Sequence, residues 1–236
     1  HSLIYDFGPG KRGIFSAADW ALLPALRKHA IGMPDLAIVS HVDQDHSGGL
    51  PRLLELHPRL PLLSGTPREL SARFALPQRV ASCHDYPGWR WDGVDFRFLT
   101  SSHGQADTNN RSCVLMVDGR HRVLLPGDIE AVRERSLLKA HGAALQADVL
   151  LAPHHGSDTS SSSGFVSRVA PRHVIFTLSR GNHWGFPSSR VLSRYASIGA
   201  TQYRSDHDGA VSVVSAAEGL SIRVERKPAT RIWRRW

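Results

Sequence analysis

The sequence predicts an α/β fold in which mixed β-sheets are covered by helices, and three observations lead to this prediction. A chain of 236 residues, 41% hydrophobic and 21% charged, is long enough to bury one large core. Short apolar runs typical of strands alternate with segments typical of helices. Tight hairpins occur among these units, which favours mixed sheets over a purely parallel sheet. No Pro- or Gly-rich linker divides the chain, so we expect one domain over residues 1–236.

The N-terminal part contains the first strand–helix units. Leu3–Phe7 is expected to form a strand that ends in the turn cluster Gly8-Pro9-Gly10. Pro24 suits the first turn of a short helix that extends to Ala30. Leu36–Val39 is a compact apolar run typical of a buried strand, and a helix is expected over Ser47–His57.

The middle of the chain contains two expected hairpins and a helix. Arg90–Leu99 and Cys113–Leu125 each hold two strand-like runs joined by an Asp-Gly pair, which is a common hairpin turn. Glu130–His141 has the pattern of a helix and is followed by a glycine, a residue that often ends helices.

The C-terminal part returns to alternating elements. Val149–Ala152 is expected to be a buried strand, and Val174–Leu178 a strand flanked by helices at Gly164–Val169 and Ser188–Ile198. The last strand-like runs are Thr201–Arg204, Ala210–Val214 and Leu220–Val224.

The formal net charge of +8, from 29 basic and 21 acidic residues, favours polyanionic partners. The excess is concentrated in residues 221–236, a tail in which Trp233 and Trp236 are interspersed with arginines. Such a mixture suits phosphates and stacked bases, although a solvated tail without function is the alternative. Cys83 and Cys113 fit no metal or redox spacing, and we expect two buried or partly buried thiols.

The strongest motif follows the strand at Leu36–Val39 and reads H-x-D-x-D-H. His41 and Asp43 alternate, so both side chains can point the same way from an extended loop, while Asp45 and His46 turn toward a second position. Imidazole and carboxylate ligands together suit zinc, manganese or iron. One loop can therefore contribute ligands to two metal ions.

A second motif leaves the strand-like run that ends at Leu125. Asp128 follows a glycine there, and its carboxylate could bridge two cations. Considered alone, the aspartate would more often cap the helix that follows.

A third motif, Pro153–Ser157, follows the strand at Val149–Ala152 and contains His154 and His155. Adjacent histidines cannot easily face one metal, so one is expected to be a ligand and the other a contact for substrate or proton transfer. All three motifs lie where strands end, positions at which a rigid sheet can hold functional loops.

These motifs together resemble the metallo-β-lactamase superfamily. More narrowly, the chain resembles the C-terminal domain of the ComEC family, the DNA-uptake channel proteins of natural competence. The segments that carry this likeness are Tyr5–Pro9, Ser40–Leu50, Asn109–Val117, Leu124–Glu130, Leu151–Ser160, Gly181–Pro187 and Asp208–Ala210. The resemblance implies a four-layer αββα sandwich with two divalent ions, Mn²⁺ or Zn²⁺, at the rim of its sheets.

The resemblance also implies a role for each residue of the motifs. His41 and Asp43 would bind the first metal, Asp45, His46 and His155 the second, and Asp128 would bridge them. Asp6 would orient the loop. The charge arrangement, rather than the resemblance, makes His154 and a water on Asp45 the catalytic groups that would transfer protons at the leaving oxygen.

The chain departs from the superfamily pattern in two places. The usual H-x-H is H-x-D here, and the middle histidine has no clear counterpart. Asn109 or Asn110 falls nearest to that position, and His103 is less well placed. A histidine is also expected near Gly185 or Phe186, and His183 is the candidate to replace it.

The function implied by the resemblance is a metal-dependent DNase that degrades the DNA strand not imported during uptake. Its partners would be DNA, expected to be single-stranded, and the membrane-channel portion of the same parent chain, without a nucleotide cofactor. We expect the chain to be a fragment of an inner-membrane protein, with this domain soluble on the periplasmic side. The alternatives are a metallo-hydrolase of a phosphodiester headgroup, lactone or thioester, and a degenerate DNA-binding domain.

Overall fold

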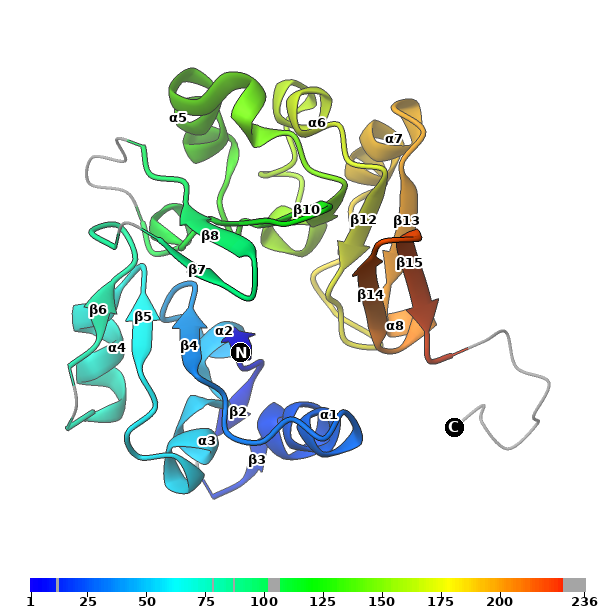
Figure 1. Cartoon of the computed structure of the whole chain (residues 1–236). Helices are drawn as coiled ribbons and strands as arrows, with labels where there is room; N and C mark the ends of the chain where they lie inside the picture. The colour runs from blue at the N-terminus through cyan, green and yellow to red at the C-terminus, as the bar shows by residue number, and fades with distance from the viewer. Residues whose placement is uncertain (12, 78, 87, 102–106, 227–236) are drawn as a thin grey trace.

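The computed structural model describes residues 1–11, 13–77, 79–86, 88–101 and 107–226 (Figure 1). Two β-sheets form the middle of the molecule. Figure 1 shows α5, α6 and α7 gathered in its upper part and α1, α3 and α4 in its lower part.

The first sheet is parallel throughout and has the strand order β1-β4-β5-β6. Its strands are β1 (Leu3–Tyr5), β4 (Leu36–Val39), β5 (Leu62–Ser64) and β6 (Ala81–Ser82). Three helices pack on its outer face: α1 (Leu23–Lys28), α3 (Leu50–Leu56) and α4 (Pro67–Phe74). Leu50, Leu53 and Leu70 of these helices are fully buried against Ala37 and Val39.

The second sheet has the strand order β13-β12-β11-β10-β9-β8-β7. Strands β7 (Trp89–Trp91), β8 (Val94–Phe98), β9 (Leu115–Asp118) and β10 (Arg122–Leu125) pair antiparallel. Strands β11 (Val149–Leu151), β12 (His173–Phe176) and β13 (Thr201–Arg204) continue the sheet in parallel from β10. Its outer face is covered by α5 (Ala131–His141), α6 (Ser163–Val169) and α7 (Ser189–Ser197).

A third core lies between the two sheets. Ile38 and Leu63 of the first sheet pack there against Leu115 of the second, with Trp89 and Phe96 at the margin. Alternate residues of a strand point to opposite faces, so Ala37 and Val39 face the helices while Ile38 faces the other sheet. The predicted four-layer αββα sandwich is therefore confirmed.

Short elements complete the described part of the chain. They are β2 (Gly10–Lys11), β3 (Phe15–Ser16), the π-helix Ala18–Leu22, α2 (Gln44–Ser47), the 3-10 helices Asn109–Arg111, Gly142–Leu145 and Pro153–Gly156, α8 (Ser205–Asp208), β14 (Val211–Ala216) and β15 (Gly219–Val224). Among the described residues, no helix combines the length and the apolar character needed to cross a bilayer.

Several boundaries differ from the prediction. The first strand ends at Tyr5, because Asp6 adopts a positive φ of 64° that strands do not accommodate. The expected helix over Ser47–His57 is wrong at its start: α2 ends at Ser47 and α3 begins at Leu50. Strand β15 includes the start of the predicted tail, whereas residues 227–236 lie outside the described residues.

The prediction of two free thiols is wrong. Cys83 and Cys113 form a disulfide, and both side chains are fully buried. Cys83 follows β6 of the first sheet, and Cys113 precedes β9 of the second, so the bond links the two sheets. The two cysteines are 30 residues apart in the sequence, and only the packing of the sheets brings them together.

Candidate metal centre

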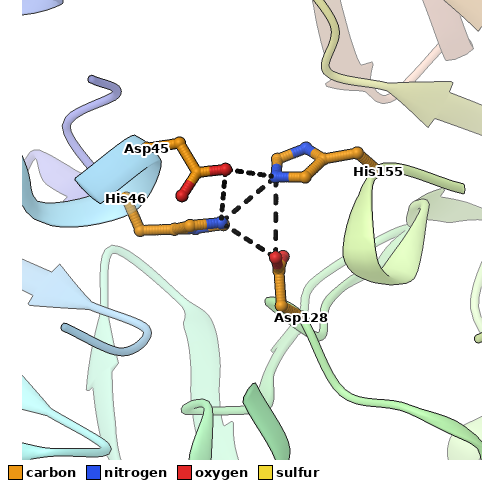
Figure 2. Close-up of side chains that lie close together, drawn as sticks. All are labelled: Asp45, His46, Asp128 and His155. Atoms are coloured by element: carbon orange, nitrogen blue, oxygen red, sulfur yellow. Dashed lines mark hydrogen bonds and ion pairs between the residues drawn. The ribbon is translucent and has the colours of Figure 1, made fainter. Parts of the chain in front are cut away.

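The three motifs meet at the ends of strands from both sheets. Asp45 and His46 lie on α2, which follows β4, and Asp128 lies in the turn after β10. His155 lies in the Pro153–Gly156 helix that follows β11. Figure 2 shows the four side chains pointing toward a common centre, with Asp45 and His46 opposite His155.

One donor atom from each of these four residues lies within 4.8 Å of the other three. The Nε2 atom of His46 is 3.1 Å from both the Oδ2 of Asp128 and the Nε2 of His155. The Oδ2 of Asp45 is 3.4 Å from His155 and 3.8 Å from His46. Tetrahedral ligands about 2.0–2.2 Å from one ion lie roughly 3.4 Å apart, so this spacing fits a divalent metal.

A second pair of donors, His41 and Asp43, adjoins this cluster. The rings of His41 and His46 are 4.3 Å apart. His41 is fully buried, and its Nε2 makes no hydrogen bond to any described residue, although the Oδ2 of Asp43 lies 3.7 Å away. A buried nitrogen without a partner costs about 1–3 kcal/mol, a cost that a bound cation would remove.

The electrostatics of the cluster also suit a cation. Burial by itself lowers the pKa of His46, but the charges of Asp128 and Asp6 outweigh it and raise that pKa well above its ordinary value. Burial opposes the charged form of Asp45 too, yet its hydrogen bond to His155 and the charge of His46 lower the pKa to about 2. Without a metal, the carboxylates therefore hold protons on the imidazoles that a divalent ion would replace.

Both cluster histidines are held through their Nδ1 atoms. His46 Nδ1 donates to the Oδ2 of Asp6 at 2.8 Å, and His155 Nδ1 donates to the Thr177 carbonyl at 2.9 Å. Asp6 also accepts hydrogen bonds from the Ser40 backbone N–H at 2.7 Å and from its hydroxyl at 2.8 Å. These bonds leave each Nε2 directed at the centre, the tautomer in which histidine binds metals.

The two adjacent histidines lie on different sides of the site. Both have positive φ, 48° for His154 and 52° for His155, and this unusual backbone separates the side chains. His154 Nε2 lies 3.9 Å from Asp128, and its Nδ1 lies 3.3 Å from Glu130. His154 is therefore at the edge of the cluster, whereas His155 is part of it.

The asparagines and His183 lie outside the cluster. Asn110 is buried and supports a loop: its Oδ1 accepts from the Glu130 N–H at 3.0 Å, and its Nδ2 donates to Asp107. Asn109 begins a 3-10 helix, and within the described residues its side chain forms no hydrogen bond to the cluster. His183 is exposed and packs on Trp184, and His103 lies outside the described residues.

Sequence reasoning missed the neutral side chains that support the site. Ser112 is buried, and its hydroxyl accepts from the Asp128 backbone N–H at 3.1 Å and lies 3.3 Å from His41 Nδ1. The Ser40 hydroxyl lies 3.0 Å from the same His41 atom. Ser40 could have been suspected because it directly precedes the histidine, whereas nothing in the sequence distinguishes Ser112 from other serines.

The comparison with family models assigns the chain to a class. Residues 1–173 match the model described as the metallo-beta-lactamase superfamily. The chain therefore belongs to the metallo-beta-lactamase superfamily, whose fold supports a metal-dependent hydrolase.

Curated relatives narrow this assignment. The chain is 34% identical over 202 residues to competence protein ComA of Neisseria gonorrhoeae, which covers 84% of this chain and 28% of that protein. It is 36% identical over 196 residues to recombination protein 2 of Haemophilus influenzae, and this match covers 81% of this chain and 23% of that protein. It is 35% identical over 214 residues to the uncharacterized protein YcaI of Escherichia coli, and this match covers 90% of this chain and 27% of that protein. The predicted relationship to competence proteins is confirmed, and the chain spans roughly a quarter of these relatives.

Proposed function

We propose that this domain is a metal-dependent nuclease that hydrolyses phosphodiester bonds in DNA, and that its substrate is the single strand not imported during DNA uptake. The convergence of Asp45, His46, Asp128 and His155 within 4.8 Å carries the hydrolytic part of the proposal. Relatives named for competence and recombination support DNA as the substrate. The net charge of +8 would keep a polyanion near the site.

The metal assignments are part of this proposal. One divalent ion, Mn²⁺ or Zn²⁺, would be held by Asp45, His46 and His155, and another by His41 and Asp43. Asp128 would contact both. When bound, such ions lower the pKa of water and neutralise the charge on phosphodiester oxygens.

The protein's own groups would position the substrate and transfer protons. The Asp45 side chain is 56% exposed, so a phosphodiester can approach it from solvent. His154 lies at the edge of the cluster and would donate a proton to the leaving oxygen, with Glu130 orienting its ring from 3.3 Å. The buried side chain of Asp128 would hold its charge at the floor of the site.

The location of the domain is also a proposal. We place it on the periplasmic side of the bacterial inner membrane, beside the channel portion of its parent protein. The buried disulfide Cys83–Cys113 supports a compartment outside the cytoplasm, because disulfides persist where the environment is oxidising.

The test is cleavage of a labelled single-stranded oligonucleotide with Mn²⁺, with Zn²⁺ and with a chelator. Asp45→Ala should lower cleavage by more than the roughly 10- to 100-fold lost when a residue that only supports a ligand is changed, because it removes a metal ligand itself. Asp95→Ala is a matched control, because Asp95 is similarly exposed, at 49%, and lies on β8 away from the cluster. Equal cleavage by both variants would contradict the proposal.

Two measurements separate the alternatives. Less than one metal per chain by elemental analysis, with DNA binding unaffected by chelator, would identify a DNA-binding domain without catalysis. Metal-dependent hydrolysis of a lactone, thioester or headgroup ester that is insensitive to salt, without DNA cleavage, would identify a different hydrolase.

A further inference from the structure

We propose that Trp184 is a stacking platform for an unpaired nucleobase next to the phosphodiester that is cleaved. This inference rests on the proposed nuclease function and specifies the subsite that would recognise a single strand. It is carried by the loop of residues 177–188, between β12 and α7, which joins the edge of the metal centre to an exposed indole ring.

The loop is fastened to the turn that contains His154 and His155. The Ser188 backbone N–H donates to the carbonyl of Gly156 at 2.9 Å. Pro187 is buried so close to Gly156 that a Cβ on this glycine would lie 2.6 Å from the proline Cβ. The ring of Phe186 meets His154 edge-on, with centroids 5.7 Å apart. The loop therefore lies beside the residue to which we assign proton transfer.

The tip of the loop has a defined shape. The Asn182 side chain donates to the Phe186 carbonyl and accepts from the Phe186 N–H, both at 2.9 Å. Gly181 and Gly185, with φ of 67° and 71°, allow the tight bends of the chain beside these two hydrogen bonds. Trp184 takes no part in these bonds, so the loop can keep its shape when the indole is removed.

Trp184 is exposed to solvent on this loop. Its side chain is 69% exposed, and within the described residues its only aromatic contact is His183, at 4.6 Å between ring centroids. An exposed π-face on a loop that is braced by the two Asn182–Phe186 hydrogen bonds suits stacking on a base, because every nucleobase has a complementary face. Bases in a duplex are covered by their neighbours, so this surface favours an unpaired base over a double helix.

The charge of the loop supports a nucleic acid as the ligand. Arg180 is exposed and forms no ion pair with any described residue, whereas Arg190 at the start of α7 pairs with Asp158 at 2.8 Å. A guanidinium on the same loop as an exposed indole, four residues before it in the sequence, can bind the phosphate that flanks a stacked base.

The experiment uses the metal-loaded domain and compares three variants on two substrates. The substrates are a single-stranded oligonucleotide and methyl p-nitrophenyl phosphate, a small phosphodiester that reports on the metal centre. Trp184→Ala should lower kcat/KM for DNA about 5- to 150-fold more than for the small substrate, the range expected for one lost stacking contact. Trp184→Phe should recover most of the loss. Trp20→Ala is the control, because Trp20 is equally exposed, at 69%, on a different element.

An abasic scan then tests the stacking itself. Wild-type protein should cleave slowly when one particular base beside the cut is missing, and Trp184→Ala should lose this sensitivity. Equal effects of the Trp184 and Trp20 variants, or an unchanged abasic profile, would overturn the inference. If wild-type protein cleaves neither substrate, the proposed function fails instead, so the two failures are distinguishable.

Discussion

The two halves of the candidate metal centre differ in how the fold supplies their ligands. Asp45, His46, Asp128 and His155 come from three segments that follow strands of both sheets, and each imidazole is held by a second partner. His41 and Asp43 come from one loop, and the Asp43 side chain is 45% exposed. We infer that the four-residue group binds a cation tightly and that the two-residue group depends on further ligands from substrate or solvent.

The largest expected effect concerns this difference. Metal titration by calorimetry should resolve a tight and a weak binding event. His155→Ala should weaken the tight event by more than the roughly 10- to 100-fold lost when a supporting residue is changed, because it removes a ligand itself. Asp43→Ala should affect only the weak event. Two events of equal affinity, both altered by Asp43→Ala, would contradict the inferred asymmetry.

The disulfide tests how strongly the two sheets are held together behind the site. Cys113 is adjacent to Ser112, which contacts His41 and Asp128. The backbone N–H of Cys113 donates to the backbone carbonyl of Ser40. A double Cys83→Ser/Cys113→Ser variant should lose about 3–4 kcal/mol of unfolding free energy, the estimate for a closed loop of this length. Urea denaturation of the variant and of the wild-type protein measures this difference in unfolding free energy.

The wild-type protein treated with a reductant should show a matching loss in the same titration. A change below about 1 kcal/mol in both experiments would mean that packing alone holds the sheets together.

A smaller effect concerns the residues that hold the imidazoles. Asp6→Asn should lower metal affinity about 10- to 100-fold, because the neutral amide is a weaker acceptor for His46 Nδ1. Thr177→Val should change it by less than about threefold, since His155 Nδ1 keeps the Thr177 carbonyl as its acceptor. The same calorimetric titration measures both. A loss below about threefold in Asp6→Asn, as expected for Thr177→Val, would show that the charge of Asp6 is unimportant.

The strands and the ligand loops could be predicted largely from local sequence. Leu36–Val39 is apolar because both of its faces are buried, and its bounds are those predicted. The sequence did not predict the segment that contains β5, α4 and β6. Strands β5 and β6 have 3 and 2 residues, which is too few to show a periodic pattern of apolar residues.

The supporting contacts could not be predicted in the same way. Ser112 reaches Asp128 and His41 only after the two sheets pack, and Cys83 meets Cys113 for the same reason. Asp6 was expected to orient the loop only through the family resemblance. Its position beside Ser40 depends on the parallel pairing of β1 with β4, which no local pattern reveals.

The last expected effect is the pH dependence of the metal-free chain. Folding raises the pKa of His46 and, through Asp45 and Asp128 acting against burial, that of His155. A histidine whose pKa is raised by folding contributes its full stability below about pH 6.5 and loses it as the pH rises through the folded value. The metal-free chain should therefore lose stability above about pH 6.5, by at most about 1.4 kcal/mol per pH unit for each proton released.

Saturating metal should remove this loss, because the ion takes the place of the protons. Urea midpoints from pH 6 to 9, with chelator or metal, measure the effect, and His46→Gln should flatten the chelator series. A metal-free chain that gains stability over this range would show that protons on these imidazoles do not offset the carboxylate charge.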